Sequence, residues 1–240
     1  MSVINSILSS QKVKGWASVS ECATLPTLDH LQLSDFDHVY EPAEDTFLLC
    51  DALHLQKKEL LELQPLMCVE IGCGSGCVIT YLGQLLQSLG HTSFSLVATD
   101  INPHALRCTA DTAKVNEVPL ETVRCSLLSG LTPRLAGRVD VLLFNPPYVP
   151  TPDEEVRGCD IEASWAGGED GRRVIDQVLP MIKGLLSPRG CLYMILVKEN
   201  KPNEIAKFCE DSGLTTEIVI MRRAKNEGLM VMKVSHCSAK

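Results

Sequence analysis

The segment VEIGCGSG spans residues 69–76, between a short apolar stretch at 66–68 and an apolar helical pattern at 78–86. This order predicts a strand, a glycine turn and a helix, in which glycines let a ligand approach the main chain closely. The glycines are spaced Gly-x-Gly-x-Gly, and Glu70 stands two positions before the first of them. A carboxylate there disfavours a pyrophosphate and favours a cationic ligand, such as the sulfonium and ammonium of S-adenosylmethionine. An ordinary helix start is the alternative interpretation of this turn.

The segment NPPY at 145–148 directly follows the apolar run at 139–144, which predicts a buried parallel strand. The side-chain oxygen of Asn145 and the carbonyl of Pro146 can accept hydrogen bonds from a planar N–H group, and this makes its nitrogen a better nucleophile. Tyr148 offers a face for stacking, and the consecutive prolines hold the acceptors in place. We predict Asn145, Pro146 and Tyr148 as catalytic residues and Asn145, Pro147 and Tyr148 as substrate-binding residues. A proline turn, or an exposed polyproline ligand, is the alternative.

Asp100 stands at the end of a second apolar strand, predicted at 94–99. In sheets of this kind an acid at that place accepts hydrogen bonds from ribose hydroxyls. Asp100 could instead cap the helix that begins at Asn102 and Pro103, although Asn102 is the better cap of the two. We therefore predict Asp100 as a cofactor-binding residue.

The chain has 240 residues, of which 45% are hydrophobic, enough for one α/β domain. The predicted strands lie at 67–72, 94–99, 121–128, 139–144, 190–197, 214–222 and 228–235, with helices between most of the first five. This alternation predicts a mostly parallel seven-stranded sheet with helices on both faces and a C-terminal antiparallel hairpin. Residues 1–37 lack a consistent period and are predicted to form a weakly structured leader before a single domain at 38–240.

The formal net charge of −8 repels phosphate backbones and makes nucleic acid a disfavoured partner. The 11 cysteines are mostly scattered inside apolar runs without a Cys-x-x-Cys pair, and the 6 histidines are dispersed, so no metal site is predicted. Free buried thiols are typical of a reducing compartment, and the longest apolar run is too short to span a membrane. We therefore expect a protein of the cytoplasm, and also of the nucleus, that uses no metal and contacts no membrane.

The chain resembles class I S-adenosylmethionine-dependent methyltransferases with their Rossmann-like seven-stranded fold, and specifically the HemK-type glutamine methyltransferases. Five segments in the family order carry the resemblance: YEPAEDT at 40–46, EIGCGSG at 70–76, DINP at 100–103, NPPYV at 145–149 and WAGGEDGR at 165–172. The resemblance implies S-adenosylmethionine as the cofactor and S-adenosylhomocysteine as its product. It also implies a protein substrate, the Gly-Gly-Gln loop of a translation release factor.

The resemblance also implies which residues contact the cofactor: Thr46, Glu70, Gly72, Gly74, Gly76, Asp100, Ser126, Leu127 and Asn145. Members of the family usually carry Asp-Leu where this chain has Ser126 and Leu127, so weaker adenine binding is expected. The short segment before the first motif resembles the eukaryotic and archaeal branch. That branch acts as a heterodimer with a small zinc-binding activator subunit, and its animal members are linked to histone lysine methylation.

Four functions remain open on these observations. The leading hypothesis is methyl transfer to the amide nitrogen of a glutamine in a release factor. Adenine methylation would use the same NPPY motif on a flipped base, but the acidic charge and the lack of a target-recognition domain oppose it. Lysine methylation requires a deprotonated amine, and the motif contains no obvious general base. A catalytically weak cofactor-binding scaffold agrees with Ser126 but not with the intact acceptors of Asn145 and Pro146.

The glycine-rich segment at 165–171 is either a substrate-facing lid or an ordinary connection.

Overall fold

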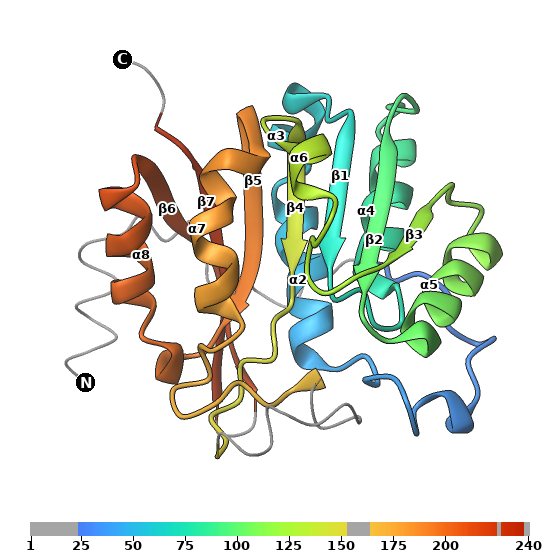
Figure 1. The fold of residues 1–240 in the computed structure, drawn as a ribbon. Coiled ribbons are helices and arrows are strands. Elements are labelled where there is room, and N and C mark those ends of the chain that lie inside the picture. The colour runs from blue at the N-terminus through green and yellow to red at the C-terminus, as the bar shows by residue number, and fades with distance from the viewer. Residues whose placement is uncertain (1–23, 153–163, 225–226, 238–240) are drawn as a thin grey trace.

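Seven strands form one sheet with the order β3-β2-β1-β4-β5-β7-β6, and helices cover both of its faces (Figure 1). The computed structural model describes residues 24–152, 164–224 and 227–237. The strands are β1 Met67–Ile71, β2 Ser95–Asp100, β3 Glu121–Arg124, β4 Val139–Phe144, β5 Leu186–Leu196, β6 Leu214–Ala224 and β7 Glu227–His236. β1 to β5 pair in parallel, whereas β7 lies antiparallel to both β5 and β6. The predicted fold class is confirmed.

The helices are α2 Glu44–Leu55, α3 Lys57–Leu63, α4 Cys77–Ser88, α5 Pro103–Val115, α6 Thr132–Leu135, α7 Ile175–Leu185 and α8 Pro202–Asp211, with the short 3-10 turns η1 Leu33–Asp35 and η4 Lys198–Asn200. Successive residues of a strand point to opposite faces, so a parallel strand covered on both sides is apolar throughout. In β4, Leu143 joins the core beneath α2 and α4, and Leu142 joins the core beneath α7 and α8. The two cores hold the sheet rigid, and its carboxyl edge carries the loops that follow β1, β2 and β4.

Two predicted strand boundaries differ from the observed ones by more than two residues. The third strand was expected to reach residue 128 but ends at Arg124, because Leu127 has a positive φ of 52° and the N–H of Ser129 donates to the carbonyl of Ser126 in a turn. The fifth strand starts at Leu186 rather than at 190, since Leu186 already pairs with Val139 across a register shift. Both differences come from pairing and turn geometry that the apolar pattern does not encode.

The predicted leader is described only from residue 24, and residues 1–23 lie outside the described residues. Residues 24–37 run along α5. Asn116 at the end of that helix exchanges hydrogen bonds of 2.9 Å with the N–H and carbonyl of Thr27, and His30 contacts the Thr112 hydroxyl at 3.1 Å. Among the described cysteines all are free thiols, and all except Cys125 and Cys237 are buried. In the described part of the chain, no helix combines the length and apolar character that crossing a membrane requires.

Candidate active site at the carboxyl edge of the sheet

The strand register brings three predicted site residues to the same edge of the sheet. Ile71 of β1 pairs with Thr99 of β2 on one side and with Phe144 of β4 on the other. The residues that follow this row are Gly72, Asp100 and Asn145. The strand order reverses between β1 and β4, and at such a switch point the loops diverge and leave a crevice for a ligand. The glycine turn after β1 and the NPPY motif after β4 therefore meet at the most favourable ligand position of this fold.

The glycine turn after β1 places its three glycines in the left-handed region, with φ values of 69° for Gly72, 53° for Gly74 and 77° for Gly76. A Cβ atom on Gly72 or Gly74 would meet no atom within 4 Å among the described residues, so both positions leave room for a ligand. A Cβ atom on Gly76 would lie 2.7 Å from the Cα of Thr109 in α5. Gly76 thus serves the close packing of α4 against α5, whereas Gly72 and Gly74 leave the main chain open.

Two threonines of α5 hold the glycine turn from below. The hydroxyl of Thr109 donates to the carbonyl of Gly74 over 3.1 Å, and the hydroxyl of Thr112 donates to the carbonyl of Ser75 over 2.8 Å. Both threonines are fully buried, so these bonds are shielded from water. In the sequence these threonines are marked only as two polar residues on the apolar face of a helix.

Asp100 is engaged with backbone amides of its own neighbourhood. Its Oδ1 accepts from the N–H of Asn102 at 2.9 Å, and its Oδ2 accepts from the N–H of Gly74 at 3.1 Å. Asn102 in turn caps α5 by accepting from the N–H of His104 at 2.9 Å, as predicted. Burial raises the pKa of Asp100, and these amide donors partly offset the rise. Each carboxylate oxygen keeps a second lone pair for a hydroxyl group.

Glu70 is buried beneath the glycine turn. Its Oε2 accepts from the N–H of Ile79 in the first turns of α4 at 3.1 Å, and its residue exposure is 2%. Burial raises the pKa of this carboxyl well above its ordinary value, opposed only in part by the Ile79 amide. The acid therefore ties the turn to α4, and a bound cation above the turn would favour its ionised form.

Asn145 is held by a residue from the first turn of α2. Its Nδ2 donates to Oδ2 of Asp45 over 3.0 Å, and the same carboxylate accepts from the Tyr40 hydroxyl at 3.3 Å and the N–H of Thr46 at 2.7 Å. A carboxylate can only accept, so the amide nitrogen of Asn145 must face Asp45. The amide oxygen is thereby turned the other way. Asp45 was not among the site residues predicted from the sequence.

The Oδ1 atom of Asn145 is buried and has no hydrogen-bond partner among the residues that the structure describes. Leaving a buried acceptor unpaired costs about 1–3 kcal/mol, so such an atom is expected only where a ligand or water completes it. Pro146 beside it is buried, and Tyr148 is 8% exposed and packs into the core beneath α2 and α4. The side-chain oxygen of Asn145, predicted as a hydrogen-bond acceptor, therefore has no donor among the described residues, while the amide is oriented by Asp45.

The remaining predicted cofactor residues lie around the same edge. Thr46 is buried at the start of α2, where its hydroxyl accepts from the N–H of Ala43 at 3.3 Å. Ser126 is exposed, and Leu127 is partly buried, in the turn after β3. The N–H of Cys125 donates to the carbonyl of Asp100 at 3.1 Å, which joins this turn to the end of β2.

These residues fit S-adenosylmethionine. The open faces of Gly72 and Gly74 admit its main-chain contacts, Asp100 offers acceptors for ribose hydroxyls, and Oδ1 of Asn145 is left without a donor while Nδ2 binds Asp45. Within the described ranges no group of three or more His, Cys, Asp or Glu side chains is arranged to hold a metal ion. The arrangement can therefore orient a planar N–H group beside a bound methyl donor.

The chain matches the family model described as the methyltransferase small domain over residues 48–157. It is 46% identical over 210 residues to a Mus musculus protein named methyltransferase HEMK2, with 88% of this chain and 95% of the mouse protein covered. It is 37% identical over 222 residues to the Schizosaccharomyces pombe eRF1 methyltransferase catalytic subunit mtq2, with 87% and 94% covered.

A solved structure of the E. cuniculi Mtq2–Trm112 complex, described as responsible for methylation of the translation termination factor eRF1, contains a similar chain. The TM-score is 0.57 at 28% identity, and 83% of this chain and 99% of that chain are covered. The N-terminal domain of human METTL16 in complex with SAH has a TM-score of 0.55 at 15% identity and shows the shared fold alone. The similarity therefore extends over almost the whole described chain.

Proposed function

The chain belongs to the HEMK2 family of methyltransferases, and from this membership we propose that it transfers the methyl group of S-adenosylmethionine to the side-chain amide of a glutamine in a translation termination factor. The observation that carries this proposal is the buried, unpaired Oδ1 of Asn145, whose amide is oriented by the bond from Nδ2 to Asp45. An amide N–H of the substrate would supply the missing donor. Relatives named for methylation of eRF1, or solved in a complex for it, support the choice of substrate.

The cofactor, when bound, supplies an electrophilic methyl group. Asn145 and the Pro146 carbonyl accept the two N–H groups of the substrate amide, which draws its lone pair out of conjugation and toward the methyl carbon. As the N–C bond forms, the S–C bond breaks and its electron pair stays on sulfur. The nitrogen then loses one of its protons to water, which restores a neutral amide. No covalent intermediate on the protein is needed, and we propose that no metal takes part.

A small partner subunit is part of the proposal. The similar E. cuniculi chain was solved in complex with Trm112, and we propose an equivalent heterodimer for this chain. That the partner binds zinc is implied only by the family resemblance. The net charge of −8 supports a protein substrate over a nucleic acid.

A lysine side chain is the second candidate for accepting the methyl group, because the carboxylate of Asp45 lies beside the side-chain amide of Asn145. Asp45 is 3.0 Å from Nδ2 of Asn145 and would attract a lysine ammonium to the crevice. The amine would still have to release a proton before it could attack. A histone tail is the substrate that this reading would imply.

The test compares possible methyl-accepting substrates under identical conditions. The protein and its partner subunit are incubated with labelled cofactor and a release-factor domain, a matched domain with the Gly-Gly-Gln glutamine changed to alanine, a histone and a DNA duplex. We expect label on that glutamine alone, located by mass spectrometry, and none with Asn145→Ala. Label on histone lysine with an unlabelled release factor would replace the leading proposal by the second, and label on DNA would overturn both.

A further inference from the structure

Asn200 is a fully buried asparagine at the carboxyl end of the sheet, in η4 just after β5. Its Oδ1 accepts from the N–H of Val197 at 2.8 Å. Its Nδ2 lies 2.8 Å from the carbonyl oxygen of Tyr148, 3.1 Å from that of Asp170 and 3.2 Å from that of Gly171. Two amide protons are thus shared among three carbonyls, and both the donor and the acceptor ends of the side chain are engaged.

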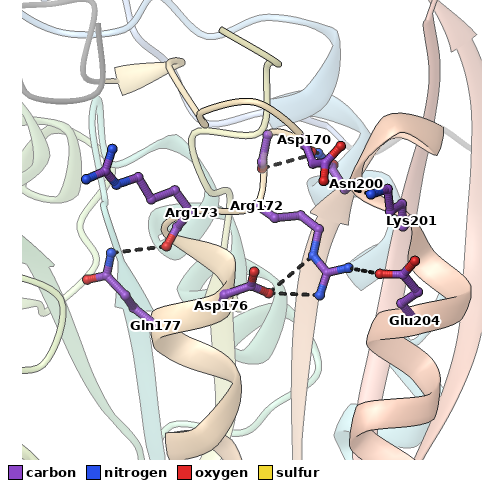
Figure 2. A network of polar contacts seen from close by, with 9 residues as sticks. Asp170, Arg172, Arg173, Asp176, Gln177, Asn200, Lys201 and Glu204 are labelled. Carbon is purple, nitrogen blue, oxygen red and sulfur yellow. Dashed lines mark hydrogen bonds and ion pairs between the residues drawn. The ribbon is translucent and has the colours of Figure 1, made fainter. Parts of the chain in front are cut away.

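The three carbonyls belong to segments that are distant in the sequence. Tyr148 ends the NPPY motif, whereas Asp170 and Gly171 belong to the glycine-rich segment that leads into α7. Figure 2 shows Asn200 beside Asp170, with Lys201 close to Asp170 and Glu204 bonded to Arg172. Asn200 therefore joins the substrate motif after β4, the glycine-rich segment and the end of β5 through one side chain.

Backbone hydrogen bonds extend this connection. The N–H of Val149 donates to the carbonyl of Trp165 over 3.0 Å, and the N–H of Gly167 donates back to the carbonyl of Val149 over 2.8 Å. The N–H of Thr151 donates to the carbonyl of Gly168 over 2.9 Å. The segments 149–151 and 165–168 thus run side by side as a short parallel bridge.

Glycines make this close approach possible. A Cβ atom on Gly167 would lie 2.6 Å from the carbonyl oxygen of Pro147. A Cβ atom on Gly171 would lie 1.9 Å from the carbonyl oxygen of Tyr148 and 2.5 Å from Nδ2 of Asn200. The two main chains are therefore in direct contact at these glycines, and a side chain at either position would force them apart.

We propose that Asn200 is a positioning residue for methyl transfer: by holding the Tyr148 carbonyl it orients the peptide planes of the NPPY motif, and with them the Pro146 carbonyl and the Tyr148 ring. Only Pro147 separates Tyr148 from Pro146 in the chain, and its ring fixes the φ torsion between them at about −65°. A shift of the Tyr148 carbonyl is therefore transmitted to the acceptor carbonyl. The inference rests on the proposed function for its catalytic consequence and on the hydrogen bonds alone for its structural part.

The exposed ion pair near Asn200 is not expected to position the NPPY motif. Lys201 pairs with Asp170 at 2.7 Å, with both side chains 47% exposed, and such pairs contribute little to stability. Asp170→Asn removes this pair and keeps the Asp170 carbonyl. It is the matched control for a change at Asn200.

The decisive variant is Asn200→Asp, which keeps an acceptor for the Val197 N–H but loses both donors and sets a carboxylate against three carbonyl oxygens. Turnover on the glutamine substrate is expected to fall about 10- to 100-fold, since a displacement of about 1 Å can cost a factor of 10² in rate. The cofactor Kd from calorimetry should change by less than about twofold, because Gly72 and Asp100 lie on other strands. Hydrogen exchange in 148–151 and 165–171 should accelerate. Asp170→Asn should match the wild type in all three measurements.

Turnover of Asn200→Asp within about twofold of the wild type, or a parallel loss of cofactor affinity, would overturn the positioning role. If Asn200→Asp does not fold, the positioning role is tested by the turnover of Gly171→Ala and by hydrogen exchange of the wild-type protein. Gly171→Ala pushes the Tyr148 carbonyl off Asn200 and should show the same selective loss, and the wild-type amides of Thr151 and Gly167 should be protected from exchange. Unprotected wild-type amides would contradict the inference. A wild-type protein that methylates no glutamine would sink the proposed function, while the exchange data would still decide the structural connection.

Discussion

The Nδ2 atom of Asn145 donates to the Oδ2 atom of Asp45 over 3.0 Å, which joins the residue after β4 to the first turn of α2. This bond selects one of the two orientations of the Asn145 amide. The orientation leaves Oδ1 buried and without a hydrogen-bond partner among the described residues. The orientation of the amide in the NPPY motif thus depends on a residue from another motif.

Asp45→Asn is expected to lower the single-turnover rate about tenfold or more, because an amide at 45 can pair with Asn145 in either orientation. Asn145→Ala is expected to lower it about 10²- to 10³-fold through loss of the acceptor itself. In the double variant, Asp45→Asn should add almost nothing to the loss from Asn145→Ala. Full additivity of the two losses in this double-mutant cycle would show that Asp45 does not act through Asn145.

Glu70→Gln is expected to change how stability depends on pH in the absence of cofactor. The pKa of Glu70 in the folded protein is raised above the ordinary value of 4.5, so the folded state retains a proton that the unfolded chain releases. The contribution of Glu70 to stability is therefore fully present below the unfolded pKa and is lost as the pH rises toward the folded pKa.

The variant should abolish this decline, so its free energy of unfolding should exceed that of the wild type most clearly near neutral pH. Urea titrations over a series of pH values measure the difference. Glu62→Gln, at an exposed position, is the control and should leave the curve unchanged. A wild-type decline that persists in Glu70→Gln would assign it to another group.

Gly76→Ala and Gly72→Ala separate packing from ligand access. Both residues have positive φ, so both variants pay a backbone cost of about 1–2 kcal/mol. Only Gly76→Ala also meets a neighbour, the Cα of Thr109 at 2.7 Å. Its melting temperature should fall further than that of Gly72→Ala, whereas Gly72→Ala should weaken cofactor binding through its Cβ on the open face. Equal melting temperatures would contradict the packing role of Gly76.

Ser126→Asp is expected to tighten cofactor binding severalfold, because an ionised acceptor for the adenine amino group is worth about 1 kcal/mol more than a hydroxyl. Calorimetry measures the change in Kd. Ser129→Asp adds the same charge at an exposed position in the same turn and should leave Kd unchanged. Equal effects of the two variants would indicate a general charge effect rather than adenine recognition.

The sequence was sufficient to predict the succession of strands along the chain and to place Gly72, Asp100 and Asn145 at the ends of three of them. Apolar runs that end in glycine or polar residues identify buried parallel strands, and parallel strands bring their carboxyl ends to one edge. The end of β3 was mispredicted because the positive φ of Leu127 interrupts a run that remains compatible with a strand. Local pattern carries no information on that torsion.

The residues that support the site could not be predicted in the same way. Asp45 lies 100 positions from Asn145 in the chain, and Asn200 lies 52 positions from Tyr148. Each stands among other polar residues, and only the folded arrangement makes it a partner. Glu70 shows the converse case, since an acid predicted for the ligand is bonded to the N–H of Ile79 beneath the turn.

The register shift between β4 and β5 lies between Val139 and Val141, at the end of the strand remote from Asn145. An inserted residue at that end can be absorbed by the existing bulge. One extra residue between Val141 and Asn145 would instead rotate the amide to the opposite face of the sheet. Insertions and deletions among relatives of this chain are therefore expected to accumulate at the amino-terminal edge of the sheet, where they leave the chemistry intact.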